Sequence, residues 1–175
     1  MRKALVIVDM QYGFINNITE HLVNRICDFV DKNREHFDLV IATQYVNNEN
    51  TPCYLFEGWK DCMEGTEEAN IVDNIISRAD HTFKKDVYSC WGNELVDTIK
   101  EHHIDKVYFV GVNTGCCVLH SAFDAYNSLQ DCAVIEDLCG STSGDESHKA
   151  AIKVLKECIT KQRVITVEQF IKEEM

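Results

Sequence analysis

An acid, an amine and two adjacent thiols stand at the ends of three stretches of this sequence that have the composition of buried strands. Asp9 closes the first such stretch, Lys85 follows a later one, and Cys116 and Cys117 come shortly after another. A free thiol has a pKa of about 8.5 and is mostly protonated at neutral pH. An ammonium and a helix N-terminus stabilise its anion, and a carboxylate can take its proton. The predicted chemistry is acyl transfer without histidine, with backbone N–H groups of the turn before the helix facing the oxyanion.

Each of these residues also has a purely structural explanation. Asp9 could cap a turn, Lys85 could form a solvated charge pair with Lys84, and a cysteine in the first turn of a helix could simply pack. Together they favour a site, because acid, cation and thiol are what a nucleophilic thiolate requires.

The segments that carry these residues alternate between apolar strands and amphipathic helices. Strands are predicted over 3–9, 38–43, 81–84, 106–111, 131–136 and 163–167. Helices are predicted over 19–30 with Thr19 as N-cap, over 67–77, 93–103, 115–127 and 145–159, and at the C-terminal end, whereas 44–66 is predicted to be a long functional loop. The pattern predicts an α/β fold with a single doubly wound, mostly parallel six-stranded sheet and helices on both faces, a Rossmann-like three-layer arrangement. Ligands bind such sheets beyond the carboxyl ends of the strands, where the reactive residues fall.

Composition limits the classes of function. The 175 residues predict one domain over 1–175, and 17 Lys and Arg against 29 Asp and Glu give a net charge of −12. This charge would repel phosphates, so we expect no nucleic-acid partner and no anionic membrane surface as a partner. The apolar runs are strand-sized and far shorter than a membrane span. We therefore expect a small-molecule substrate.

Nine cysteines are unusual for a chain of this length. Their odd number and the lack of a secretion signal predict free thiols in a cytoplasmic protein, with Cys27, Cys132 and Cys158 serving as small hydrophobic residues. No Cys-x-x-Cys pair occurs, the histidines are scattered, and Cys53 and Cys62 lie nine positions apart in a loop. No metal and no cofactor are therefore predicted.

Three short motifs surround the reactive residues. Val8-Asp9-Met10-Gln11-Tyr-Gly-Phe14, Lys85-Asp-Val-Tyr88-Ser89 and Gly111-Val-Asn-Thr114-Gly-Cys-Cys117-Val118 occur in this order. They are similar to the Asp-x-Gln-x-x-Phe, Lys-x-x-Tyr-Ser and Gly-x-x-Thr-x-x-Cys-Val motifs of the isochorismatase-like cysteine hydrolases, the superfamily that contains nicotinamidases and other small amidases. The resemblance covers nearly the whole chain, from Leu5 to the terminal strand.

The resemblance implies a role for each reactive residue. Cys117 would be the nucleophile, Asp9 the general base, and Lys85 the cation that stabilises the thiolate and orients the acid. Cys116 would stand at a variable position beside the pocket. The resemblance also implies a cis peptide bond before Asn113, which would aim the N–H groups of Asn113 and Cys117 at the oxyanion. A homodimer or homotetramer is expected from the same family.

The sequence departs from nicotinamidases where these carry a metal site built from an Asp and two His after the second strand. The corresponding stretch, Thr43–Asn47, holds no histidine, which argues against a metal and against nicotinamide as the substrate. Cys90-Trp91 and Gly115 stand where the family often has Ala-Phe and Asp. The substrate pocket therefore does not transfer from the family.

Aromatic residues cluster near the long loop and the Lys85 turn, namely Tyr45, Phe56, Trp59, Tyr88 and Trp91. They predict an aromatic wall for a flat or apolar acyl group, while packing of the loop or a dimer contact would explain them equally well. The predicted oxyanion and substrate-binding residues are Asn113, Cys116, Phe14, Tyr45, Trp59 and Tyr88.

The loop Gly140-Ser-Thr-Ser-Gly144, before the helix that carries His148, could cradle a phosphate. It fits neither common phosphate motif, and Asp145 and Glu146 would repel an anion. We expect a polar loop in which Ser or Asp caps the helix.

The predicted function is hydrolysis of a small amide, or a related carbon–nitrogen bond, through an acyl-thioester intermediate. Isochorismatase chemistry on a vinyl ether is one alternative, but the members of the superfamily that perform it lack the nucleophilic cysteine. The other alternative is a non-catalytic small-molecule-binding protein or a thiol redox sensor, because Cys116 adjoins Cys117 and an exposed thiolate of low pKa is an oxidation target.

Overall fold

The central strands are buried on both faces. In the computed structural model, which describes residues 1–174, β1 (Lys3–Val8) is buried from Ala4 onward. Successive side chains point to opposite faces of the sheet, so Val6 packs into one core and Ile7 into the other. This burial on both faces explains why the strand is a continuous apolar run in the sequence.

Six strands form one sheet of parallel strands in the order β3-β2-β1-β4-β5-β6. The other strands are β2 (Leu39–Tyr45), β3 (His81–Lys85), β4 (Lys106–Val112), β5 (Asp131–Gly140) and β6 (Val164–Ile165). The chain moves outward from β1 to β3 and then returns to the other side of β1, so the strand order reverses between β1 and β4. The predicted doubly wound sheet is confirmed, although β5 is longer and β6 shorter than the sequence predicts.

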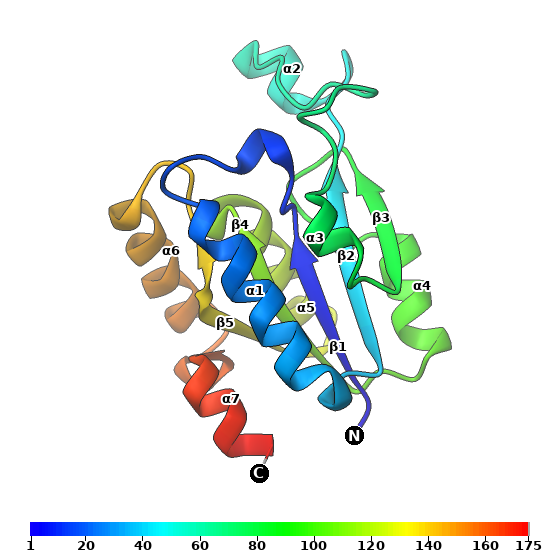
Figure 1. Cartoon of the computed structure of the whole chain (residues 1–175), viewed down its shortest axis with the longest axis vertical. Helices are drawn as coiled ribbons and strands as arrows, with labels where there is room; N and C mark the ends of the chain where they lie inside the picture. The colour runs from blue at the N-terminus through cyan, green and yellow to red at the C-terminus, as the bar shows by residue number, and fades with distance from the viewer. Residues whose placement is uncertain (175) are drawn as a thin grey trace.

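Helices cover both faces of this sheet, as Figure 1 shows. On one face, α1 (Glu20–Asn33), α3 (Asp73–Ile76) and α7 (Val167–Glu174) pack against the side chains that share a core with Ile7. On the other face, α4 (Asn93–Glu101), α5 (Leu119–Asn127) and α6 (Asp145–Cys158) pack against those that share a core with Val6. The predicted three-layer arrangement is confirmed.

One short helix, α2 (Pro52–Glu57), stands above the carboxyl ends of the strands, in the stretch predicted to be irregular (Figure 1). Its signals are present in the sequence. The Thr51 hydroxyl accepts a hydrogen bond from Tyr54 N at 3.2 Å, Pro52 opens the helix, and Gly58 ends it with a left-handed φ of 67°. A helix of 6 residues is too short to display an apolar period, and only these end signals could have revealed it.

Two helix boundaries also differ from the prediction. The helix expected over 67–77 is reduced to α3, because the residues before it form turns and pair Ile71 with Gln11. Thr19 precedes α1 but does not cap it, because its hydroxyl donates to Phe14 O at 2.7 Å. In both places tertiary contacts replace the local helical signal.

All nine cysteines are free thiols. Cys27 and Cys132 are buried as predicted, but Cys158 is exposed, because the buried face of α6 is formed by Ile152 and Leu155. Among residues 1–174, no helix is long and apolar enough to cross a membrane.

Candidate active site

Asp9 is the first residue beyond β1, at the point where the strand order reverses. Its backbone has a left-handed φ of 49°, a region that Asp adopts more readily than most residues. The side chain is fully buried, and its Oδ1 accepts a hydrogen bond from Thr43 Oγ1 on β2 at 2.7 Å. Thr43 Oγ1 in turn accepts from Asp9 N at 3.2 Å. These contacts fix the carboxylate at the carboxyl end of the sheet.

Lys85 ends β3, and its side chain reaches past β2 to Asp9. Lys85 Nζ lies 2.6 Å from Asp9 Oδ2, and the lysine side chain is 7% exposed. The ammonium also donates to Val87 O at 3.1 Å and lies 5.1 Å from the centre of the Tyr45 ring. Burial disfavours the ammonium, but interactions led by the Asp9 charge outweigh it and raise the pKa of Lys85. Lys85 is half of a buried ion pair and not a solvated surface charge.

Cys117 lies in a π-helical turn, Thr114–Val118, which follows β4 and leads into α5. Cys117 is 4% exposed, and its backbone carbonyl accepts a hydrogen bond from Ser121 Oγ at 2.6 Å. The peptide bond between Val112 and Asn113 is cis, as the family resemblance implies. The helix predicted from residue 115 therefore begins with a wider turn that carries Cys117.

Gly111 allows the end of β4 to lie directly against β1. Its φ is 113°, and a Cβ atom at this position would lie 2.2 Å from Val8 O. No other residue fits there without movement of the backbone, which explains the first glycine of the third motif. This close approach brings the turn that carries Cys117 next to Asp9.

The electrostatic setting of Cys117 differs from the predicted one. Burial is the largest influence and raises the pKa of the thiol well above its ordinary value; the Asp9 charge adds to this, and Lys85 opposes it. The prediction relied on a helix N-terminus and a nearby ammonium to stabilise the thiolate, and it did not include the burial of the thiol or the adjacent Asp9 charge. The resting site therefore holds a neutral thiol beside the Asp9–Lys85 ion pair.

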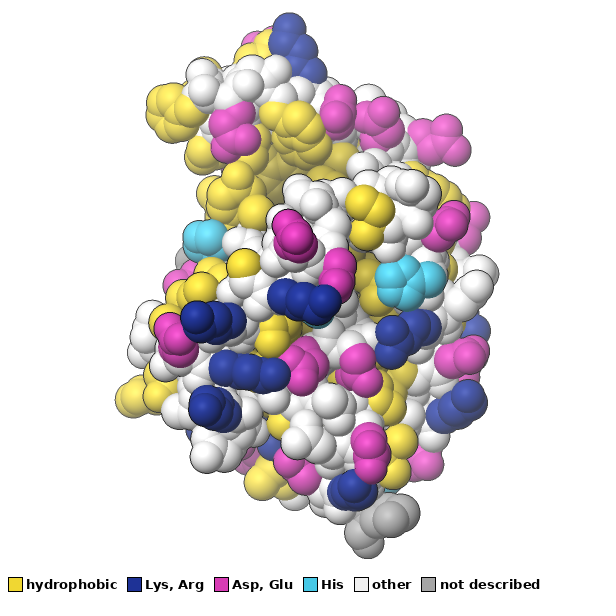
Figure 2. Space-filling view, turned by 90° about the vertical axis from the view of Figure 1, so that its left-hand side faces the viewer, with side chains coloured by type: hydrophobic (Ala, Val, Ile, Leu, Met, Phe, Trp, Pro, Cys, Tyr) yellow, Lys and Arg dark blue, Asp and Glu magenta, His cyan; other side chains and the backbone are white. Residues whose placement is uncertain are grey.

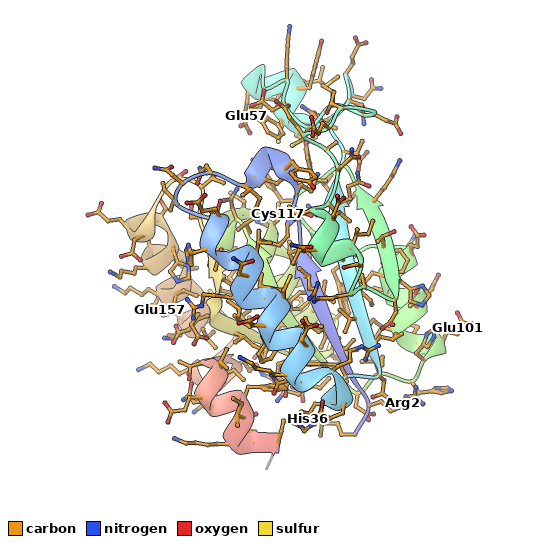
Figure 3. The ribbon with its side chains drawn as sticks, in the orientation of Figure 1. Arg2, His36, Glu57, Glu101, Cys117 and Glu157 are labelled. Atoms are coloured by element: carbon orange, nitrogen blue, oxygen red, sulfur yellow. The ribbon has the colours of Figure 1, made fainter. Side chains whose placement is uncertain are left out.

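A cavity of about 460 Å³ has Cys117 in its lining. Six of the residues predicted to surround the nucleophile also line it, namely Phe14, Tyr45, Trp59, Tyr88, Asn113 and Cys116. The rings of Phe14 and Trp59 stack at 6.0 Å, and those of Tyr45 and Trp59 lie 5.8 Å apart. Figure 2 shows a hollow with hydrophobic side chains below the projecting part of the molecule that contains α2. Figure 3 shows Cys117 below α2 as well.

Two residues of the predicted aromatic wall lie elsewhere. Phe56 is 85% exposed, because α2 presents Cys53 and Glu57 to the cavity and Phe56 to solvent. Trp91 packs edge-on against Phe109, with ring centres 6.3 Å apart, and so belongs to the core on one face of the sheet.

Half of the lining was not predicted, namely Gly13, Asn16, Cys53, Glu57, Asp61, Thr142 and Ser143. Cys53 and Glu57 are one turn apart on α2, so the end signals of this helix would have pointed to them. Thr142 and Ser143 belong to the loop expected to cap α6. Gly144 occupies the N-cap position instead, without a side-chain hydrogen bond.

The Thr142 loop is tied to the turn before Cys117. Thr142 N donates to Asn113 Oδ1 at 2.7 Å, so the side chain of Asn113 holds the cavity wall. Gln11 of the first motif has a similar holding role, because its amide accepts from Tyr45 N at 2.7 Å and donates to Tyr45 O at 2.8 Å. Asn113 and Gln11 therefore hold the backbone around the reactive groups in place.

His148 on α6 contacts the turn that carries the nucleophile. Its Nδ1 lies 2.9 Å from Thr114 Oγ1. Burial is the main cause of a lowered pKa for His148, so the neutral imidazole is favoured in the folded protein. The sequence offers no signal for this contact, because the two residues are 34 positions apart.

The donors of a nicotinamidase-type metal site do not occur after β2. Asn47 is committed to backbone carbonyls there, because its amide donates to Trp59 O at 2.9 Å and to Asp61 O at 3.1 Å. Within residues 1–174, no three His, Cys, Asp or Glu side chains are grouped as metal ligands would be. The residues present do not fit that metal.

Comparisons with known proteins agree with the fold. Residues 3–169 match the family model described as "Isochorismatase domain". Isochorismatase family protein 1A of Dictyostelium discoideum is 24% identical, over 69% of this chain and 64% of that protein, so the chain spans slightly less than two thirds of this relative. A nicotinamidase of Acinetobacter baylyi is 25% identical, over 78% of this chain and 80% of that protein.

Solved structures show the same architecture at low identity. An isochorismatase-like hydrolase from Alkaliphilus metalliredigens has a TM-score of 0.86 at 21% identity, covering 100% of both chains. N-carbamoylsarcosine amidase from Thermoplasma acidophilum has a TM-score of 0.80 at 22% identity, covering 95% of both chains.

Proposed function

The chain belongs to the isochorismatase family of hydrolases, and from this premise we propose that it hydrolyses a small amide, or a related carbon–nitrogen bond, through a thioester on Cys117. The observation that carries the proposal is the buried ion pair in which Lys85 Nζ lies 2.6 Å from Asp9 Oδ2. Besides the larger effect of burial, the charge of Asp9 raises the pKa of the Cys117 thiol and that of Lys85 lowers it. Desolvated ionisable groups next to a nucleophile in a cavity are typical of catalytic sites.

In the proposed acylation step, the Cys117 sulfur attacks the carbonyl carbon while Asp9 takes the thiol proton. A carbon–sulfur bond forms and the carbonyl electron pair moves to oxygen. Backbone N–H groups of Asn113 and Cys117 would stabilise that oxyanion. Collapse of the intermediate breaks the carbon–nitrogen bond, and Asp9 returns the proton to the leaving nitrogen as ammonia or an amine.

Deacylation reverses the roles of the same groups. Asp9 takes a proton from a water molecule while the oxygen of that water attacks the thioester carbon. The carbon–sulfur bond then breaks, and the proton returns to the Cys117 sulfur as the carboxylic acid leaves. Lys85 holds the Asp9 carboxylate in place in both steps through their 2.6 Å contact.

The raised pKa of Cys117 supports proton transfer during the attack. A buried thiol with a raised pKa provides little thiolate at neutral pH. If Asp9 takes the proton during the attack, no standing thiolate is needed. The pKa of Cys116 is also raised, chiefly by burial and then by Cys53 and Glu57, which belong to the cavity wall.

Ammonia release from a panel of small primary amides tests the proposal. We expect Cys117→Ala to lower kcat by about 10³-fold or more, because the covalent route is lost. Cys158→Ala removes an exposed thiol on α6 and should leave turnover unchanged. Mass spectrometry of acid-quenched enzyme should find the acyl group on Cys117. Undiminished turnover by Cys117→Ala, or an acyl group on Cys116, would contradict the mechanism.

A further inference from the structure

The charged side chains that line the cavity are all acidic. Of its 14 lining residues, all within residues 1–174, Glu57 and Asp61 are acidic and none is Lys, Arg or His. The ammonium closest to the nucleophile, that of Lys85, is paired with Asp9. A substrate that enters this cavity therefore meets negative charge without a compensating cation.

The two acids differ in what holds them. Asp61 Oδ2 accepts a hydrogen bond from the indole Nε1 of Trp59 at 3.0 Å. Glu57 Oε1 accepts from the Tyr88 hydroxyl at 3.3 Å, and Tyr88 lines the same cavity as Cys116. Burial is the chief cause of the raised pKa of the Cys116 thiol, next to the nucleophile, and Cys53 and then Glu57 add to it.

Glu57 therefore contributes an exposed carboxylate to the cavity lining from α2, in contact with the Tyr88 hydroxyl. Figure 3 shows Glu57 at α2, above Cys117 in that view. His120 lies outside the lining, and its ring lies 5.3 Å from the Tyr88 ring. Its Nδ1 lies 2.8 Å from Cys116 O, a carbonyl to which it can donate.

The aromatic wall suits the same kind of ligand as the carboxylate. Phe14 and Trp59 stack nearly parallel, with 13° between their planes, and Tyr45 and Tyr88 also line the cavity. Aromatic faces attract cations, and a carboxylate beside them adds a counter-ion. The net charge of −12 adds a field that favours approach of cations and disfavours anions. On the face in Figure 2, most Lys and Arg side chains lie well below the hollow.

We propose that this cavity selects small amides that carry a positive charge away from the scissile bond, with Glu57 as the counter-ion. This inference rests on the proposed amidase function and names its substrate class. It excludes carboxylate-bearing amides as good substrates, because their charge would face Glu57 and Asp61. Glu57 acts on specificity and takes no part in bond breaking.

Three amides of matched length test the proposal: 4-(trimethylammonio)butanamide, its neutral isostere 5,5-dimethylhexanamide, and the anionic glutaramate. We expect kcat/KM for the cation to exceed that for the neutral isostere by about tenfold, with glutaramate the poorest. Glu57→Gln should reduce the cation preference toward one. Glu64→Gln changes the same charge in the same loop but outside the lining, where Glu64 pairs with Lys84, and should keep the preference.

Binding separates this inference from the amidase proposal. In Cys117→Ala, quenching of tryptophan fluorescence reports binding of each amide without turnover. Tighter binding of the cation, weakened by Glu57→Gln but not by Glu64→Gln, supports the inference even if the wild type hydrolyses none of the three. Equal binding of the cation and its neutral isostere, or tighter binding of glutaramate, overturns the inference whether or not amides are hydrolysed.

Discussion

The charged groups of Asp9 and Lys85 lie 2.6 Å apart although their strands, β1 and β3, are separated by β2. The long lysine side chain spans the width of β2, and Thr43 on that strand supports the carboxylate. Water has little access to the pair, so neither charge can be solvated if the other is removed. The pair is therefore a point at which stability and the proposed chemistry are coupled.

Asp9→Asn should destabilise the protein by about 3–5 kcal/mol, because it leaves the buried Lys85 ammonium without a counter-charge. The double variant Asp9→Asn/Lys85→Met should recover much of that loss. Urea denaturation at neutral pH measures both. Asp145→Asn breaks an exposed pair with Lys149 and should change the unfolding free energy little. Strictly additive losses in the double variant would show that the two residues are not coupled.

The buried thiols should make the protein less stable at alkaline pH. Burial is the chief cause of raised pKa values in Cys90, to about 12, and Cys132, to about 11, from an ordinary 9.0. The unfolded chain then releases these protons at lower pH than the folded one. The unfolding free energy should therefore be unaffected by these thiols below pH 9 and fall as pH rises toward 12.

Cys90→Ala isolates one of these thiols. It should reduce the slope of unfolding free energy against pH by up to about 1.4 kcal/mol per pH unit in that interval. Cys158→Ala, at an exposed position, should leave the slope as it is. Urea denaturation at several pH values between neutrality and the alkaline limit measures the slope, and an identical slope in Cys90→Ala would refute the assignment.

Gly111→Ala should destabilise the protein by about 3 kcal/mol or more, because its Cβ would lie 2.2 Å from the backbone oxygen of Val8. Gly92→Ala is the matched control, because a Cβ there meets nothing within 4 Å. The control should cost about 1 kcal/mol or less. Thermal or urea denaturation distinguishes them, and similar losses for both would contradict the close approach of β4 and β1.

His148 should make stability depend on mildly acidic pH. Its pKa is lowered by burial from an ordinary value of 6.5. The unfolded chain therefore takes up this proton before the folded one, so the stability present above pH 6.5 is lost as pH falls toward the folded pKa. His148→Gln should flatten the dependence in that interval. His21→Gln changes an exposed histidine on α1 and should not flatten it. Equal dependence in both variants would argue against the His148 assignment.

The order of the strands and helices and the parallel sheet could be predicted from the sequence alone. Strands such as β1 and β4 are continuous apolar runs because both of their faces are covered, and such runs can be recognised in the sequence. The reactive residues could be named because strand ends in this topology meet at one edge of the sheet. Their roles in catalysis stay predictions.

Tertiary structure alone decided the charge states and the shape of the cavity. The helix-terminus argument predicted a lowered pKa for Cys117, but burial and the pairing of Lys85 with Asp9 reverse the direction. Local sequence cannot show how much water a side chain loses, since that depends on every element packed above it. For the same reason the presentation of Glu57 to the cavity by α2, and of Phe56 to solvent, became visible only in the folded chain.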